Sequence, residues 1–250
     1  MARIIPLSDL WFLLFLIILS GNVIQGMTGF GAGLVSGPIL AIFLEPKLVI
    51  VILLVTGTSS LILVVYHARK HIDPRRLLPL VLSAIIGIPF GSYLLMAVSP
   101  TMTRLLIAII SISFSILLLL GYSKRLKREF LASCGFGFAS GVLTANIGMG
   151  GPPIVIFLAN QGWPKEVFRA TVASLFLISG TLCLFSHVFT GVTTGDRMLI
   201  GVSFIPASII GFYLGDALFA KISRKLFINL ALILILISGL TSLAISLTKI

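Results

Sequence analysis

The stretch Asn146-Ile147-Gly148-Met149-Gly150-Gly151-Pro152-Pro153 interrupts an apolar run from about Phe130 to Asn160. Inside a helix, glycine costs roughly 1 kcal/mol and proline roughly 3 kcal/mol relative to alanine, so no straight helix passes through this stretch. In hydrocarbon, the backbone groups freed by the break need partners in the protein or in a water-filled cavity. The stretch therefore predicts a broken helix that lines an interior path.

A second interruption of this kind lies in the first half of the chain, at Thr28-Gly29-Phe30-Gly31-Ala32-Gly33-Leu34-Val35-Ser36-Gly37-Pro38. It also lies inside an apolar run and ends in Gly-Pro. The two Gly-x-Gly segments are 117 positions apart, and His67 and His187 are 120 apart. Gly87-x-x-x-Gly91 and Gly211-x-x-x-Gly215, at an offset of 124, each place two glycines one turn apart and predict close helix packing. These matches predict an internal duplication.

The composition indicates an integral membrane protein. The chain is 58% hydrophobic and 10% charged, with a mean hydropathy of +1.19, whereas soluble domains are about 25% charged. The net charge of +11 does not indicate nucleic-acid binding, because Lys and Arg lie in the short connections between apolar runs. We expect one all-α polytopic membrane domain over residues 1–250, with the lipid bilayer as its surroundings. It is divided into a four-element repeat over about 8–122, a basic linker at 123–129 and a second four-element repeat over about 130–248.

The apolar runs predict the spans. The first run, from about Leu10 to Leu44, would measure roughly 50 Å as one helix against a hydrocarbon core of about 30 Å, so it must break at its glycines. Each half contains one such broken helix. The unbroken spans are predicted at 48–66, 77–98 and 105–122 in the first half and at 167–189, 198–220 and 226–247 in the second.

The positive charges predict an orientation, because loops rich in Lys and Arg stay cytoplasmic. If each broken stretch crosses the membrane once, the 18 Lys and Arg divide 11 against 7 between the two sides. If each enters and returns to its own side, they divide 13 against 5, with the basic loops 69–76 and 124–128 in the cytoplasm. The second count leaves three crossings per half, so the halves would be inverted, as in many secondary transporters. We treat this re-entrant topology as a hypothesis.

The paired glycine segments and the two-fold repeat resemble the sulfite exporter TauE/SafE family of membrane transporters. The resemblance rests on Gly37-Pro38 and on Gly148-Met149-Gly150-Gly151-Pro152, and it covers the chain from about Gly21 to Gly239. It implies a multi-pass protein of a bacterial plasma (inner) membrane that moves small anions. Sulfite, sulfoacetate and other organosulfur compounds are the substrates proposed within the family.

The broken helices are also the candidate binding site. A helix N-terminus offers unpaired N–H groups and about half a positive charge, so an anion can bind there without an arginine. Pro38 and Pro152 suit the first turn of such a half-helix. The alternative is that the glycines only permit tight helix crossing. The candidate substrate-binding residues are Thr28, Gly29, Gly31, Gly33, Ser36, Gly37, Pro38, Asn146, Gly148, Gly150, Gly151 and Pro152.

Three titratable residues are candidates for proton coupling. Asp216 is the acidic residue most deeply embedded in a predicted span, and His67 and His187 end equivalent spans. The alternatives are an interfacial ion pair of Asp216 with Lys221 or Arg224, and interfacial capping by the histidines. The histidines have no i, i+4 pairing with one another or with carboxylates, so we predict no metal site.

Three classes of function remain to be compared. The leading prediction is a secondary transporter that exports a small anion by alternating access around the two breaks. A membrane enzyme is not expected, because the chain has neither an H-E-x-x-H motif nor a G-x-S-x-G motif, and no cofactor is predicted. The alternative is a non-transporting accessory or assembly protein. The apolar surface is compatible with a monomer or a homodimer.

Overall fold

The computed structural model describes residues 7–97 and 128–223 continuously, with isolated positions between 99 and 116 and between 225 and 244. All regular elements in the described part are helical, and four helices are long and apolar enough to cross a membrane. This confirms the prediction of an all-α membrane protein. The predicted spans at 105–122 and 226–247 and the linker charges at 124–127 lie outside the continuously described residues.

The first half begins with a broken helix, as predicted. Helices α1 (Leu7–Thr28) and α2 (Ala32–Phe43) are followed by α3 (Pro46–Ala68), the short 3-10 helix η1 (Arg69–His71) and α4 (Pro74–Ala97). The break falls at residues 29–31, where Gly29 and Gly31 have φ of 82° and 102°. Glycine adopts this left-handed region without the strain that a side chain would add.

The described part of the second half has a similar order of helices. Helices α6 (Glu129–Ile147) and α7 (Gly151–Gln161) form the broken helix, followed by α8 (Lys165–Phe189). The single span predicted at 198–220 is instead two helices, α9 (Gly195–Ser203) and α10 (Ile205–Phe219), which meet at an angle of 41°. Pro206 lies in the first turn of α10 and has no amide N–H. It therefore cannot donate the hydrogen bond that a continuous helix would need at this position, which accounts for the bend.

The chain reverses direction at the first break, so α1 and α2 form a hairpin, here called the first hairpin, with its tip at residues 29–31. The Ser36 hydroxyl donates to the carbonyl of Ile17 at 2.8 Å. Further from the tip, Leu14 and Leu40 share a buried cluster. Because residues later in α2 contact residues earlier in α1, α2 runs back along α1 instead of continuing its direction.

The second break reverses the chain in the same way, and α6 and α7 form the second hairpin with its tip at residues 148–150. Close to this tip, the Ser140 hydroxyl donates to the carbonyl of Gly150 at 2.9 Å. Further back, the rings of Phe136 and Phe157 stack with centroids 5.5 Å apart. Both broken stretches therefore enter the fold and return.

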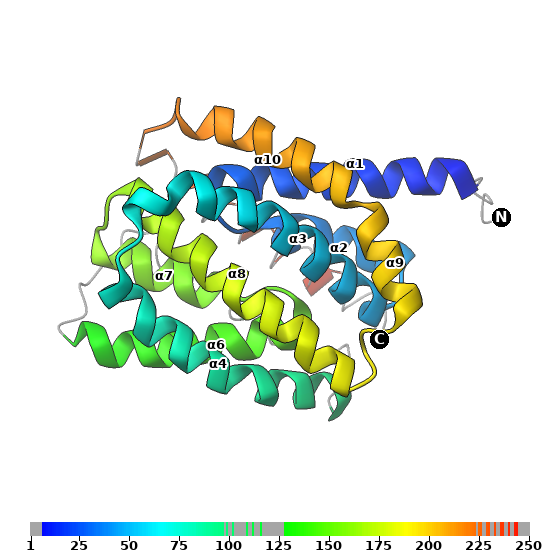
Figure 1. Cartoon of the computed structure of the whole chain (residues 1–250), viewed down its shortest axis with the longest axis horizontal. Helices are drawn as coiled ribbons and strands as arrows, with labels where there is room; N and C mark the ends of the chain where they lie inside the picture. Colours follow the sequence, from blue (N-terminus) through cyan, green and yellow to red (C-terminus); the bar gives the residue numbers. More distant parts are fainter. Residues whose placement is uncertain are drawn as a thin grey trace.

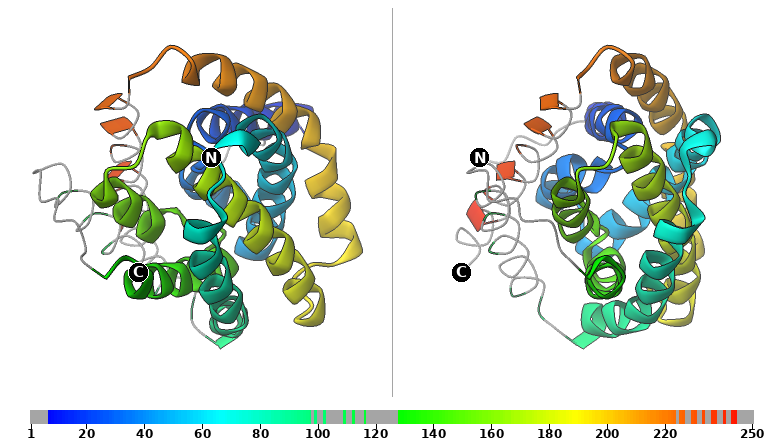
Figure 2. Two further views of the ribbon diagram at one scale, coloured as in Figure 1. Left: turned by 60° about the vertical axis from the view of Figure 1, so that its left-hand side comes forward. Right: turned by 90° about the vertical axis from the view of Figure 1, so that its left-hand side faces the viewer.

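The two glycine pairs lie where helices from opposite halves pack closely. A Cβ at Gly87 would lie 3.0 Å from the Val142 nitrogen on α6, and a Cβ at Gly215 would lie 2.7 Å from the Met27 nitrogen on α1. The prediction of close packing at these glycines is therefore correct. Figures 1 and 2 show α1 beside α10 along one edge of the molecule and α4 beside α6 along the other, with α3 and α8 between.

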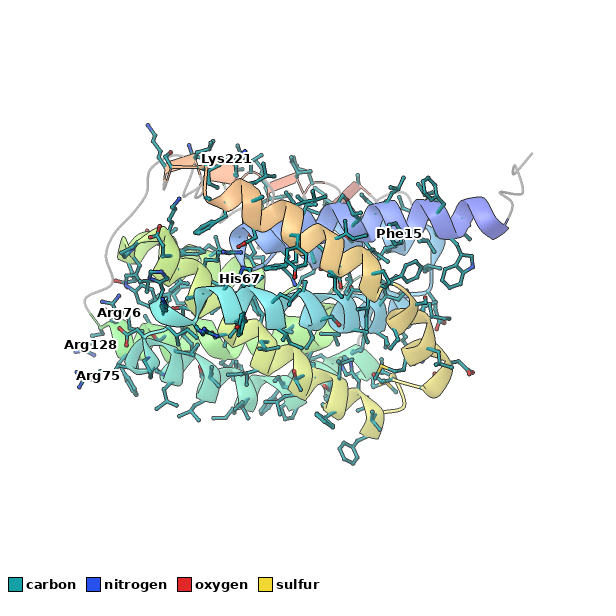
Figure 3. All side chains as sticks on the ribbon, turned by 45° about the horizontal axis from the view of Figure 1, so that its top comes forward. Phe15, His67, Arg75, Arg76, Arg128 and Lys221 are labelled. Atoms are coloured by element: carbon teal, nitrogen blue, oxygen red, sulfur yellow. The ribbon has the colours of Figure 1, made fainter. Side chains whose placement is uncertain are left out.

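Basic residues from several segments of the described part gather at one end of the helices. Figure 3 labels Arg75, Arg76 and Arg128 together at this end, with Lys221 toward the same side, whereas Phe15 lies far from it. Arg75 lies in the first turn of α4, just after the connection from α3, and Arg128 immediately precedes α6. The fold thus brings the basic segments predicted to share a membrane face to one end, here called the basic end.

Candidate functional site

The tips of the two hairpins meet inside the fold. A Cβ at Gly33, in the first turn of α2, would lie only 2.6 Å from the carbonyl oxygen of Gly148. Across the same junction, a Cβ at Gly151 would lie 3.1 Å from the ring of Phe30. Residues that are more than 100 positions apart thus form one junction, and glycine is needed at Gly33 because the neighbouring atom is main chain.

A cavity of about 50 Å³ lies at this junction. Its volume is comparable to that of a few water molecules. Both hairpins line it, and α3 and α8 close its sides. The lining residues are Gln25, Phe30, Gly31, Gly33 and Leu34 of the first hairpin, Thr144, Gly148, Met149, Gly150 and Gly151 of the second, Leu53, Leu54, Gly57, Thr58 and Leu61 of α3, and Phe176 and Gly180 of α8.

Two helix N-termini face this cavity, and neither is capped by a side chain. The residues at the N-cap positions of α2 and α7 are Gly31 and Gly150, and neither position makes a side-chain capping hydrogen bond. The first three N–H groups of a helix have no partner within it. In α2 these groups belong to Ala32, Gly33 and Leu34. In α7 only Gly151 offers one, because the two residues that follow it are prolines. The N-termini of α2 and α7 therefore contribute positive partial charge at the cavity without a cationic side chain among its lining residues.

Five of the predicted substrate-binding residues line the cavity: Gly31, Gly33, Gly148, Gly150 and Gly151. The predicted polar donors do not line it, because each makes a hydrogen bond inside the fold. Thr28 donates to the carbonyl of Ile24 at 2.8 Å, and Ser36 donates to Ile17. Asn146 donates to the carbonyl of Gly91 at 3.4 Å. Ser36 thus joins α2 to α1, Asn146 joins α6 to α4, and Thr28 bonds within its own helix.

The other predicted residues lie around the junction. Gly29 packs against Arg169, and Gly37 packs against the side chain of Met149. Pro152 lies in the first turn of α7, as predicted. The prediction for Pro38 is wrong, because α2 begins at Ala32 and Pro38 lies inside the helix. The glycines with positive φ, and not the proline, set the start of α2.

Sequence reasoning missed the polar residue of the first hairpin that lines the cavity. Gln25, 5% exposed, donates through Nε2 to the carbonyl of Gly57 at 2.7 Å and to the Ser60 hydroxyl at 2.6 Å. Ser60 donates in turn to Asn22 Oδ1 at 2.9 Å. These bonds join α1 to α3 beside the cavity. An isolated glutamine in an apolar helix was the available signal, because a buried polar side chain normally has a hydrogen-bond partner.

The candidate proton-coupling residues separate into two locations. Asp216 on α10 accepts from Arg169 at 2.6 Å and lies 3.0 Å from Nδ1 of His67. The ion pair of Asp216 is therefore not with Lys221, because Lys221 follows the end of α10 whereas Asp216 faces α3 and α8. Arg169, one of the 18 Lys and Arg in the charge count, is 4% exposed within α8. A cation inside an apolar span was the signal that identifies it.

His187 lies at the opposite end of α8. Its Nε2 is 2.9 Å from the carbonyl oxygen of Ala145 on α6, and its side chain is fully buried. The sequence-equivalent histidines thus have different partners: His67 contacts a carboxylate, whereas His187 contacts a backbone carbonyl.

One comparison with known proteins gives a match. A family model described as sulfite exporter TauE/SafE matches residues 13–242, which include both hairpins and the cavity between them. No curated protein and no solved structure matches the chain.

Proposed function

The chain belongs to the sulfite exporter TauE/SafE family, and we propose that it is a secondary transporter that exports a small anion, with sulfite, sulfoacetate and related organosulfur compounds as the candidate substrates. The family is one of membrane transporters and not of enzymes. The proposed location is a bacterial plasma membrane, with the basic end in the cytoplasm. The proposed architecture is a pair of inverted repeats.

One observation carries this proposal: two uncapped helix N-termini, one from each half, face a single cavity. Each N-terminus supplies the equivalent of about half a positive charge. Because the cavity walls are otherwise mostly apolar, an anion there exchanges its water for N–H donors of α2 and α7. The arrangement matches that of transporters whose discontinuous helices bind substrate near the bilayer midplane.

The shape of the hairpins supports alternating access. Each hairpin enters the fold and turns back, and its tip lies beside the cavity. The helices also pair crosswise, α1 with α10 and α4 with α6, so each pair combines elements of both halves. In the proposed mechanism, movement of one hairpin tip past the other opens the cavity first to the cytoplasm and then to the outside.

The test is transport by the purified protein in liposomes. Radiolabelled sulfite, sulfate, thiosulfate and small sulfonates are loaded inside, and their exchange is measured with and without a proton gradient. We expect saturable exchange of at least one of these anions. Absence of exchange for every anion, with a protein shown to be folded, would contradict the proposal and favour the accessory protein.

A matched pair of glycine variants tests the site itself. Gly151→Leu fills the cavity, because a Cβ there already approaches Phe30 at 3.1 Å. Gly135→Leu, on the same hairpin, places its Cβ where no described residue lies within 4 Å. We expect the first variant to lose exchange and the second to retain it. Gly150 is less suitable, because its Cβ would lie 2.7 Å from the main-chain carbonyl of Ser140 and would distort the hairpin.

A further inference from the structure

Three titratable side chains from three helices form a cluster that runs from the surface inward. His67 on α3 is 38% exposed, Asp216 on α10 is 27% exposed and Arg169 on α8 is 4% exposed. The carboxylate of Asp216 joins the other two, with one oxygen toward each. The outer members of the cluster are therefore accessible from the surface of the fold, whereas the innermost member is shielded.

Arg169 also holds the tip of the first hairpin. Its guanidinium donates to the carbonyl of Gly26 in the last turn of α1. The carbonyls of the last turn have no partner within the helix, and a cation there interacts favourably with the helix dipole. The main chain and Cγ of Arg169 pack against Gly29, at the break itself. The next residues along the chain, Phe30 and Gly31, line the cavity.

The guanidinium is not fully satisfied in this conformation. Its Nε is buried and has no hydrogen-bond partner among the described residues. A buried donor without a partner costs on the order of 1–3 kcal/mol, so such groups in native structures call for an explanation. An arginine that also takes up a second position, with other partners, supplies one.

Few charged residues of the described part lie near Asp216. On α8, Lys165 lies one turn before Arg169, but its ammonium is bound to the carbonyls of Phe219 and Ile222 at the end of α10. The only titratable residue of α1 is Asp9, near its opposite end. The turn η1 adds three basic residues at the outer end: Arg69, Lys70 and His71. Asp216 is thus the single described acid that neutralises the buried guanidinium.

We propose that Arg169 is a positioning residue that couples proton uptake by the His67–Asp216 pair to the position of the first hairpin tip, and hence to the anion site. This inference rests on the proposed function. Proton uptake at either member reduces the negative charge beside the guanidinium by one unit. A buried cation without a counter-charge is strongly disfavoured. Arg169 then leaves the Gly26 carbonyl for the wet basic end, and the tip is free to move.

The first test needs no substrate. Met27, 5% exposed in the last turn of α1, is changed to cysteine in a chain where Cys134 and Cys183 are replaced by alanine. Its labelling rate by a small thiol reagent is divided by that of an Arg75→Cys chain at the same pH, which removes the reagent's own pH dependence. We expect labelling about tenfold faster near pH 5 than near pH 8, within the usual range of coupling between two sites.

Charge variants then assign the effect. Asp216→Asn should be labelled fast at both pH values, and His67→Gln, which keeps the Arg169 ion pair, should shift the response to lower pH. Arg169→Lys keeps the charge but not the planar guanidinium, whose Nη2 bonds both the Gly26 carbonyl and Asp216, and should label faster than wild type near pH 8. Glu45→Gln is the matched control. Glu45 pairs with Arg197 at a distance of 2.7 Å, and it lies at the end of α2 opposite the hairpin tip. It should behave as wild type.

Sulfite flux in liposomes separates this inference from the proposed function. At a given pH, sulfite has the same ionisation state in the assays of wild type and of Asp216→Asn. A difference in flux between them is therefore caused by the protein. We expect the variant to keep sulfite exchange without a gradient and to lose its acceleration by a proton gradient. The coupling role of Arg169 is wrong if the labelling rate changes neither with pH nor in Asp216→Asn. It is also wrong if Asp216→Asn keeps the full acceleration of sulfite exchange by a proton gradient. Absence of exchange in wild type contradicts the sulfite proposal, while the labelling result still decides the role of Arg169.

Discussion

Gly33 lies against the carbonyl oxygen of Gly148, so that a Cβ on Gly33 would be 2.6 Å from that oxygen. One residue belongs to the first turn of α2 and the other to the break between α6 and α7. This contact joins the two halves of the chain at the cavity. It also makes the junction sensitive to single methyl groups, because a main-chain oxygen cannot rotate away as a side chain can.

Gly33→Ala should therefore impair the site. We expect a loss of stability of about 1–3 kcal/mol, the usual cost of overpacking, together with a larger loss of anion exchange. Gly57→Ala is the control, because its Cβ would meet Gln25 at an ordinary 3.5 Å at the same cavity. Thermal unfolding and liposome exchange measure the two effects. Equal behaviour of the two variants would contradict the importance of the Gly33–Gly148 contact.

The crosswise helix pairs should be equally sensitive. Gly215→Ala would bring a Cβ to 2.7 Å from the Met27 nitrogen, and Gly91→Ala would bring one to 2.9 Å from Cβ of Ala145. We expect both to lower stability by about 1–3 kcal/mol. Gly135→Ala, with open space around its Cβ, should be neutral or stabilising, since alanine favours helix. Thermal unfolding of the detergent-solubilised protein compares all three, and a destabilised Gly135→Ala would refute the packing explanation.

The charge of the cavity can be tested at Gln25. Gln25→Glu keeps the shape of the side chain but places a carboxylate where an anion is proposed to bind. We expect the KM for sulfite to rise about tenfold or more, because like charges a few ångströms apart repel strongly in a poorly hydrated site. Gln25→Met removes the hydrogen bonds without adding charge, so it separates the two effects. If both variants change KM equally, charge repulsion is not the cause.

The proposed topology predicts the sides of two loops. A cysteine at Arg75, at the basic end, should react only from the cytoplasm. One at Asp196, in the first turn of α9, should react only from outside. Impermeant thiol labelling of intact spheroplasts and of inverted vesicles measures each, with both native cysteines replaced. Labelling of both positions from the same side would contradict the re-entrant topology.

The sequence predicted most of the elements because their causes are local. Apolar length marked the spans, and Gly29, Gly31 and Gly148 marked the breaks, since a main-chain φ above zero is a property of one residue. Where local rules competed, the prediction was less accurate. Pro38 was taken to start a half-helix that begins at Ala32, and the bend before Pro206 was read as a continuous span.

The sequence predicted some of the residues that line the cavity. Five glycines at the breaks line the cavity, but Thr28, Ser36 and Asn146, which were expected to add donors, make their hydrogen bonds within the fold. A polar side chain in an apolar run signals that a partner exists, but it does not say whether that partner is a ligand or a neighbouring helix. Gln25 and Arg169 were missed for the same reason.

The sequence by itself determined that this chain is a helical membrane protein with two broken helices, because hydropathy and backbone propensity act on residues close together in the chain. Only the tertiary structure decided that the breaks reverse the chain, that their tips meet at one cavity, and that Asp216 faces Arg169 and His67 instead of Lys221. Those relationships depend on which helix faces pack together. Packing is set by contacts between residues more than a hundred positions apart, which no local pattern contains.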